Sequence, residues 1–293
     1  MRRWESPASG AEKENALKEK GAIYVAAGET YLHETLRSAE SLKRHMPDLP
    51  ITLFADRHPP QESLFDEIKI LKDCAYGFID KIQPMQRSPY RQTIFLDSDT
   101  YIASGFNELF DLLERFEIAA ALDTWREGDP VPECPRSFFE INTGVILYRN
   151  VPSVQTFFQA WFDEYRLQLT RSSPPSNDQP SFRKILFQSS LAFFTLPPEY
   201  NYLLWSPGFI GANSKVKILH GRTLEMEPLA LRMNASRAAR VFLPTANSLE
   251  DRSFQVLTPG GKKLGWFFSR VFKPSLKHLP RRARTVSRNP SHR

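Results

Sequence analysis

The chain has 293 residues, of which 41% are hydrophobic and 25% are charged. This balance is that of an ordinary globular protein with one large domain or two small ones, and it excludes collagenous, disulfide-scaffold and wholly disordered classes. No run approaches the roughly 18–20 continuous apolar residues of a membrane span. Cys74 and Cys134 lack CxxC or zinc spacing, so we expect reduced thiols and a cytoplasmic protein.

Charge is distributed unevenly along the chain. From Arg252 onward there are eleven Lys and Arg residues and no Asp or Glu, whereas the preceding part carries 28 basic and 33 acidic residues. The first twenty residues are charged and have no apolar core, so we expect no secretory signal there. A basic tail on an acidic body predicts an anionic partner, which is membrane phospholipid, nucleic acid or an acidic protein.

Short apolar runs alternate with helical patterns along most of the chain. Residues 31–46 carry apolar side chains at spacings of three and four, which is typical of an amphipathic helix. The alternation predicts an α/β fold with a mixed, mostly parallel central sheet flanked by helices. Buried strands are predicted at residues 22–26, 51–55, 68–71, 93–96, 118–122, 145–148, 193–196 and 216–219.

We expect a single folded domain with a basic C-terminal extension. Residues 1–20 form a flexible lead-in, and the fold of the domain at 21–222 is expected to close near residue 222. Residues 223–273 form an extension that contains an amphipathic aromatic and basic segment. Residues 274–293, with three prolines and five arginines, are expected to be a disordered basic tail.

The strand at 93–96 is followed by two carboxylates, Asp97 and Asp99, on either side of Ser98. Ligands of open α/β sheets bind beyond the carboxyl ends of the strands. Two hard oxygen ligands at that place suit Mn²⁺ or Mg²⁺, which in turn can hold a diphosphate. Asp is also a common turn residue, but the position directly after a buried strand favours a functional role.

A phosphatase of the haloacid dehalogenase class also carries Asp-x-Asp after a strand. Its pattern has Thr or Val two residues after the second Asp, where this chain has Tyr101. Its motif usually follows the first strand, whereas this one follows the fourth. We therefore rank the phosphatase interpretation low.

Segments on both sides of the Asp pair resemble the nucleotide-sugar-dependent glycosyltransferases with the GT-A (Rossmann-like) fold. The resemblance is greatest to the glycogenin and lipopolysaccharide galactosyltransferase type, glycosyltransferase family 8, and covers about residues 21–222. It implies a hexosyltransferase that moves a sugar, with retention, from a nucleotide diphosphate sugar (UDP favoured) to a glycan, lipid-linked or protein acceptor. The matching segments are residues 24–31, Lys81, 96–99, 142–144, 177–179 and 220–221.

The resemblance assigns the donor to residues around the Asp pair and after the first strand. Tyr31 matches the residue beneath the base, and Lys81 matches a basic residue near the donor. Asp123, which follows the strand at 118–122, is expected to hydrogen-bond the sugar hydroxyls. The nucleotide- and donor-binding positions are Ala26, Ala27, Gly28, Tyr31, Lys81, Asp97, Ser98, Asp99, Asp123, Thr143, Gly144 and Gly221.

The same resemblance implies catalytic residues and a metal site. Asp178 and Gln179 match a pair beside the reacting carbon, and Asn142 belongs to the turn that faces the sugar. The implied metal ligands are Asp97, Asp99 and His220, and mixed carboxylate and imidazole ligation favours Mn²⁺ over Mg²⁺. A divalent cation offsets the charge of a diphosphate leaving group. The choice between double displacement and same-face attack stays open.

Plainer structural roles exist for the same residues. His220 can be a partner-satisfied histidine at a strand end, and Asn142 can be turn chemistry. Asn177 or Asp178 can cap the helix that follows. A capping residue can also face a cleft, so the two interpretations of Asp178 are compatible.

The basic tail allows two interpretations. Residues 262–273 mix aromatic and basic side chains, and a helix there would place Leu264, Phe267, Phe268 and Val271 on one face. That composition is typical of an interfacial membrane helix, with anionic lipid as the partner of residues 252–293. The alternative is a helix packed on the domain with a loose end. Nucleic acid is not expected, because no recognition motif is present.

Two functions from different classes remain after this reading. The first is a metal-dependent glycosyltransferase, in the cytoplasm or peripheral on the cytoplasmic face of a membrane. The second is a domain that binds a nucleotide sugar or a glycan without catalysis. The first is favoured because the donor, metal and sugar-facing positions of the resemblance are all present.

Overall fold

The computed structural model describes residues 17–123, 131–223, 225–243 and 253–256. Its strands are β1 (Lys18–Ala26), β2 (Ile51–Ala55), β3 (Glu67–Ile70), β4 (Tyr90–Leu96), β5 (Thr100–Ile102), β6 (Ile118–Leu122), β7 (Ile141–Arg149), β8 (Phe193–Leu196), β9 (Tyr202–Leu203), β10 (Gly208–Ile210), β11 (Ile218–His220), β12 (Arg240–Leu243) and β13 (Ser253–Val256). Its α-helices are α1 (Glu29–His45), α2 (Ile82–Gln86), α3 (Pro152–Leu169), α4 (Gln179–Gln188) and α5 (Met226–Asn234).

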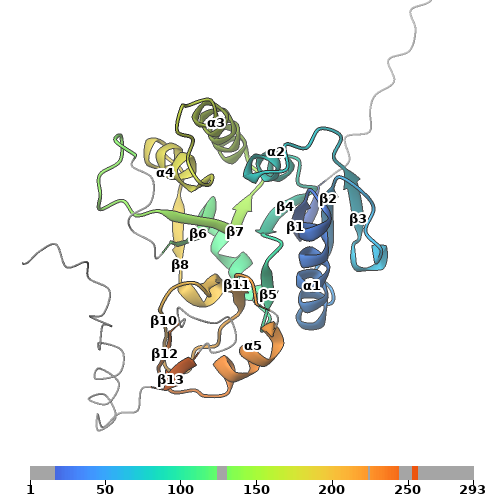
Figure 1. The fold of residues 1–293 in the computed structure, drawn as a ribbon, viewed down its shortest axis with the longest axis vertical. Helices are drawn as coiled ribbons and strands as arrows, with labels where there is room; N and C mark the ends of the chain where they lie inside the picture. Colours follow the sequence, from blue (N-terminus) through green and yellow to red (C-terminus); the bar gives the residue numbers. More distant parts are fainter. Residues whose placement is uncertain (1–16, 124–130, 224, 244–252, 257–293) are drawn as a thin grey trace, which may run out of the picture. The chain divides into compact units, whose positions relative to one another are not determined.

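A seven-stranded sheet in the order β3-β2-β1-β4-β7-β6-β8 forms the centre of the fold (Figure 1). Strand β7 is antiparallel to both of its neighbours, and the remaining pairs are parallel. The predicted mixed, mostly parallel α/β sheet is therefore confirmed. Because Leu96 pairs with both Tyr24 and Val145, the ends of β1 and β4 and the beginning of β7 lie at one edge.

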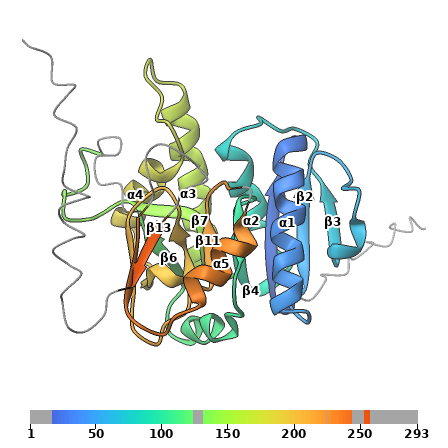
Figure 2. The ribbon, with the colours of Figure 1, turned by 60° about the horizontal axis from the view of Figure 1, so that its bottom comes forward.

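Both faces of the sheet are covered by apolar side chains. Helix α1 packs its buried face on one side together with the short 3-10 helix Asn107–Glu114. Helices α2, α3 and α4 pack on the other side, where Trp161 and Phe182 are fully buried. Figure 2 shows α1 running along β2, with α3 and α4 beyond β7. Burial on both faces explains why these strands are continuous apolar runs rather than alternating patterns.

The predicted strands are found with small differences in length. The bounds 51–55, 118–122 and 193–196 agree with β2, β6 and β8. Strand β1 starts at Lys18, which pairs with Tyr90, so residues 18–20 belong to the sheet rather than to a flexible lead-in. These residues are exposed, and their polar side chains hid the strand from a search for apolar runs.

The packed structure continues beyond residue 222, where we expected the fold to close. Helix α5 packs Met226 and Met233 against Tyr202 in a third apolar cluster. The Arg240 guanidinium is fully buried and donates to the carbonyl oxygens of Met233, Ala238 and Ser214. A buried arginine and short strands give no apolar periodicity, so this region had no signal in the sequence.

The contacts divide the chain into a unit that ends at Val256 and a second one, Leu257–Arg293. The second unit lies outside the described residues, and so does the predicted aromatic and basic segment at 262–273. Among the helices that the structure describes, none has the length and apolar character that a bilayer crossing requires.

Candidate functional site

A cavity of about 690 Å³ opens at the edge where β1 and β4 end and β7 begins. Its wall also includes the start of α4 and the end of β11. Thirteen predicted site residues line it, namely Ala27, Tyr31, Lys81, Asp97, Ser98, Asp99, Asp123, Asn142, Thr143, Gly144, Asp178, Gln179 and His220. The topology thus brings together side chains that are up to 193 residues apart in the sequence.

Three predicted donor-binding residues do not line this cavity. Ala26 is fully buried in the core at the end of β1. Gly28 precedes α1 with φ 101°, and Gly221 follows β11 with φ 132°, so both adopt a backbone conformation that favours glycine. The Gly221 N–H donates to the Asp99 carbonyl oxygen over 3.0 Å, which holds the Asp99 turn against β11. These three residues therefore shape the backbone around the cavity and do not form its lining.

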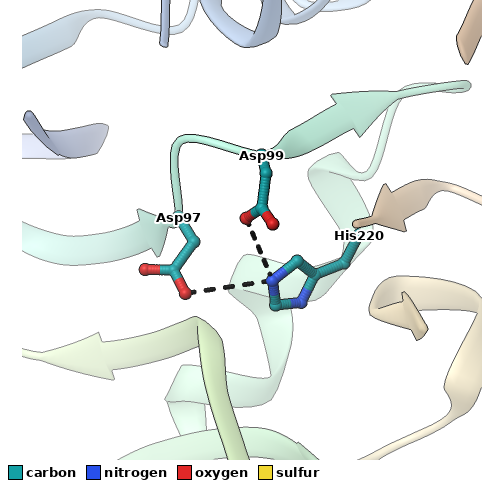
Figure 3. Close-up of side chains that lie close together, drawn as sticks. All are labelled: Asp97, Asp99 and His220. Atoms are coloured by element: carbon teal, nitrogen blue, oxygen red, sulfur yellow. Dashed lines mark ion pairs between the residues drawn. The ribbon is translucent and has the colours of Figure 1, made fainter. Parts of the chain in front are cut away.

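Asp97, Asp99 and His220 form one cluster in spite of their separation in sequence (Figure 3). Asp97 follows β4, Asp99 precedes β5, and His220 ends β11. The antiparallel pairing of β5 with β11 sets Thr100 opposite His220, which carries the imidazole to the two carboxylates. The Nε2 atom of His220 lies 3.2 Å from Asp99 Oδ1 and 3.9 Å from Asp97 Oδ2.

Gly144 makes room for that imidazole. A Cβ atom at this position would lie 2.0 Å from the Cε1 atom of His220, which is far inside van der Waals contact. The Gly144 carbonyl oxygen also accepts the Asp97 N–H over 2.8 Å. The expected role of Gly144 in donor binding has a structural basis, because any side chain here would displace a member of the cluster.

Asn201 orients the imidazole from behind. Its Oδ1 atom lies 2.9 Å from Nδ1 of His220, and its Nδ2 atom donates to Oδ1 of Asn142 over 2.8 Å. Because Oδ1 can only accept, Nδ1 carries the proton and Nε2 is left to face the carboxylates. Sequence reasoning missed Asn201, since a single Asn after a Pro-Pro-Glu-Tyr stretch carries no motif.

Lys81 is a buried cation between two carboxylates. Its Nζ atom lies 3.5 Å from Asp97 Oδ1 and 3.2 Å from Asp178 Oδ2. It also donates to the carbonyl oxygen and the hydroxyl of Thr143. Burial alone would lower the pKa of Lys81, but the charges of Asp178 and Asp97 outweigh it and raise that pKa. The lysine is thus held in its charged form in the wall of the cavity.

The two carboxylates of the cluster have different electrostatic surroundings. Burial raises the pKa of Asp97 above its usual range in spite of Lys81 and His220. Burial also acts on Asp99, but His220 and Arg222 together lower the pKa of Asp99 to about 2. Asp99 in turn overcomes the effect of burial on His220 and raises its pKa. Asp99 is therefore the more strongly acidic of the two carboxylates.

Three expected sugar-facing residues form a hydrogen-bonded group. The amide of Asn142 donates to Asp123 Oδ2 over 3.2 Å and to Gln179 Oε1 over 3.0 Å. The amide of Gln179 donates to Asp123 over 3.1 Å and to Glu140 over 3.3 Å. Glu140 was missed because it precedes β7 without any motif. The group offers several oxygen atoms, which suits recognition of hydroxyl groups.

Asp178 is more enclosed than we expected. Its carboxylate is almost fully buried, accepts the Thr143 hydroxyl over 3.1 Å and pairs with Lys81. Asp178 occupies the N-cap position of α4, but its side chain makes no cap hydrogen bond. The Oδ1 atom of Asn177 instead accepts the Gln179 N–H over 3.0 Å. The capping alternative thus applies to Asn177, and Asp178 supports Lys81.

Glu34 and Arg222 close the other side of the Asp pair. Arg222 donates twice to the Glu34 carboxylate, over 2.7 and 3.2 Å, and also lies 3.4 Å from Asp99. The Ser98 hydroxyl donates to the same carboxylate over 2.9 Å. Glu34 lies inside α1 and belongs to no motif, so sequence reasoning did not select it.

The ligand atoms offered by Asp97, Asp99 and His220 suit a divalent cation. Ligand atoms from Asp97, Asp99 and His220 all lie within 4.8 Å of one another. Neighbouring ligands of an octahedral ion at about 2.1 Å are about 3 Å apart, so the His220–Asp99 pair already has this spacing and the wider separations would shorten around an ion. Two carboxylates and an imidazole with a fixed tautomer suit Mn²⁺ or Mg²⁺.

The strand order of the central sheet, its single antiparallel strand and the cluster of Asp97, Asp99 and His220 after β4 define the class of fold, which is GT-A-like. Two crystal structures of the glycosyltransferase GlyE from Streptococcus pneumoniae TIGR4, one of them the apo form, share it with a TM-score of 0.52 and 18% sequence identity. The similarity covers 74% of this chain and 61% or 60% of GlyE, which is less than two thirds of that protein. No protein-family model matches the sequence. No curated protein matches it either.

Proposed function

We propose that this protein is a metal-dependent glycosyltransferase that uses a nucleotide diphosphate sugar, with UDP favoured, as its donor. The observation that carries the proposal is the Asp97, Asp99 and His220 cluster in the wall of a 690 Å³ cavity, beside the buried cation Lys81. A cavity of this size matches a nucleotide-sized ligand. The resemblance to family 8 and the GT-A-like fold shared with GlyE support the same reading.

The residues of the cluster would hold Mn²⁺, or Mg²⁺, through two carboxylates and Nε2 of His220. When bound, the ion supplies a Lewis acid that offsets the negative charge of the departing diphosphate. Lys81 and Arg222 line the same cavity and add positive charge on either side of the Asp pair. Donor binding would therefore exchange the carboxylate partners of these two cations for phosphate oxygens.

The sugar would lie against the group formed by Asn142, Gln179 and Asp123. Asp178 is almost fully buried and engaged by Lys81 and Thr143, whereas Gln179 is half-buried and lines the cavity, so we place the Gln179 amide nearest the anomeric carbon. An amide or carboxylate oxygen at that position can stabilise an oxocarbenium-like transition state. We propose retention of configuration, as the resemblance implies, and a glycan, lipid-linked or protein acceptor.

Calorimetric titration with UDP, with and without Mn²⁺, tests the binding half of this proposal. Asp97→Asn and His220→Gln should each abolish the metal-dependent part of UDP binding while the protein stays folded. Asp163→Asn is the matched control, because Asp163 lies on the exposed surface of α3, outside the cavity. UDP binding that is equally tight in excess chelator would contradict the metal role.

Turnover separates an enzyme from a domain that only binds. A panel of UDP-, GDP- and TDP-sugars is incubated with Mn²⁺, and released nucleotide diphosphate is followed by mass spectrometry. We expect slow hydrolysis of one donor, which Gln179→Ala reduces. Tight UDP binding without turnover on the whole panel would favour the non-catalytic alternative.

A further inference from the structure

Tyr76 holds an exposed aromatic ring at the mouth of the cavity in an unfavourable backbone conformation. Its φ is 56°, in the left-handed region that residues other than glycine rarely adopt. The residue is 61% exposed and lines the cavity. Because the backbone of Tyr76 is strained and its ring is exposed to solvent, this residue contributes little to the folded core. Such a combination indicates a role in ligand binding.

The Asp80 carboxylate enforces this conformation. Its two oxygens accept the N–H groups of Ala75 over 2.8 Å and of Gly77 over 3.1 Å, which are the residues on either side of Tyr76. Asp80 belongs to the short 3-10 helix Phe78–Lys81, whose last residue is the buried lysine of the site. The position of the Tyr76 ring is therefore tied through one turn to Lys81.

Tyr31 faces the same space from the first turn of α1. It is 43% exposed and lines the cavity. A Cβ atom built on Gly28 would lie 3.8 Å from a ring atom of Tyr31 and 3.8 Å from a ring atom of Tyr76. These ring atoms are thus no further apart than twice that distance. Since stacked atoms lie about 3.5–4.0 Å apart, a gap within this limit takes at most one flat ring between the two tyrosines.

We propose that Tyr31, Gly28 and Tyr76 form a slot for the planar base of a nucleoside diphosphate, in which Tyr76 is the second wall. The proposal rests on the proposed use of a nucleotide sugar. Gly28 does not line the cavity itself, but a side chain at this position would reach van der Waals contact with both rings, so glycine leaves the space between them free. Stacking uses the π-face that every base possesses, so the slot contributes affinity without selecting one pyrimidine over another. UDP and TDP should therefore depend on Tyr76 to a similar extent.

The test compares two ligands that share the diphosphate and differ in the base. Wild-type protein and variants are titrated with UDP and with inorganic pyrophosphate, each with Mn²⁺. Tyr76→Ala should weaken UDP binding by about 5- to 150-fold, the range for loss of one base–aromatic stack, and leave pyrophosphate binding unchanged. Tyr76→Phe should bind both ligands like the wild type, because the ring remains.

Further variants separate binding from stability. Tyr76→Gly should lose as much UDP affinity as Tyr76→Ala, yet its Tm should not be lower, since glycine adopts φ 56° without strain. Asp80→Ala should weaken UDP binding, because the turn that presents the ring is released. Phe209→Ala is the matched control, because Phe209 is an equally exposed aromatic outside the cavity. Phe209→Ala should leave the binding of both UDP and pyrophosphate unchanged.

The outcomes distinguish the slot from the proposed function. If the wild type binds neither UDP nor pyrophosphate with Mn²⁺, the proposed function fails and the slot fails with it. If the wild type binds UDP and Tyr76→Ala binds it equally well, the slot alone is overturned. A loss that appears in Trp205→Ala, the exposed aromatic beside His220, instead of Tyr76→Ala would place the base at the other end of the cavity. An equal loss of pyrophosphate in Tyr76→Ala would mean that the variant disturbs Lys81.

Discussion

Replacement of Lys81 by methionine should destabilise the protein substantially. The side chain is buried, and its ammonium lies 3.5 Å from Asp97 and 3.2 Å from Asp178. The variant leaves the buried carboxylate of Asp178 and the half-buried carboxylate of Asp97 without their cation. Removal of one partner from a buried ion pair typically costs about 3–5 kcal/mol, which for a folded unit of this size lowers Tm by about 6–20 °C.

Metal and pH should each restore part of that loss. A cation bound at Asp97 neutralises charge that Lys81 no longer balances, so Mn²⁺ should raise the Tm of Lys81→Met more than that of the wild type. Burial already raises the pKa of Asp97, and without Lys81 that pKa rises further. Protonation then relieves the repulsion, so the deficit in Tm should shrink as the pH falls from 8 to 5. Differential scanning fluorimetry across pH and Mn²⁺ concentration measures both effects.

Lys184 provides a matched control for this reasoning. It also lies between two carboxylates, 3.0 Å from Glu164 and 3.1 Å from Glu133, but outside the cavity and partly exposed. Lys184→Met should lower the stability by no more than about 1 kcal/mol and leave the Mn²⁺-induced shift unchanged. If Lys81→Met melted like the wild type, or if Mn²⁺ shifted both proteins equally, Lys81 would not be the counter-charge of the metal-binding carboxylates.

Three further predictions concern parts of the molecule that Lys81 does not touch. Gly144→Ala should lower Mn²⁺ affinity at least about tenfold, because its Cβ would displace the His220 imidazole; unchanged affinity would contradict the steric role. Asn201→Asp keeps an acceptor for Nδ1 of His220 but loses the donor to Asn142. This variant should retain Mn²⁺ affinity and lose turnover, whereas Asn201→Ala should lose both. We also propose that residues 252–293 bind anionic membranes, at about 1 kcal/mol per engaged basic residue. The full chain should sediment with anionic vesicles and a chain ending at Val256 should not, and equal sedimentation would leave a packed helix or a loose end.

Much of the sheet and the cluster of Asp97, Asp99 and His220 could be predicted from the sequence. Strands that are buried on both faces are written as short apolar runs, and their order with one long amphipathic helix indicates an α/β fold. Asp97 and Asp99 stand directly after such a run, where ligands of these sheets bind. His220 was selected through the resemblance to family 8, and its place after an apolar run, just before a glycine, agrees with that choice. Local signals of this kind survive without tertiary contacts.

Other features depended on contacts between distant segments. That Asn201 fixes the imidazole, that Glu34 holds Arg222 and that Gly144 lies beneath His220 follow from pairs separated by 19, 188 and 76 residues. Single polar or small residues without a motif carry no periodicity, so their partners are set only when β11 pairs with β5 and β7 enters the sheet. The sequence by itself therefore determined the strands of the central sheet and which side chains follow them. The tertiary structure decided which of those side chains meet, because the hydrogen bonds and close contacts at the site join residues that only the packed sheet brings together.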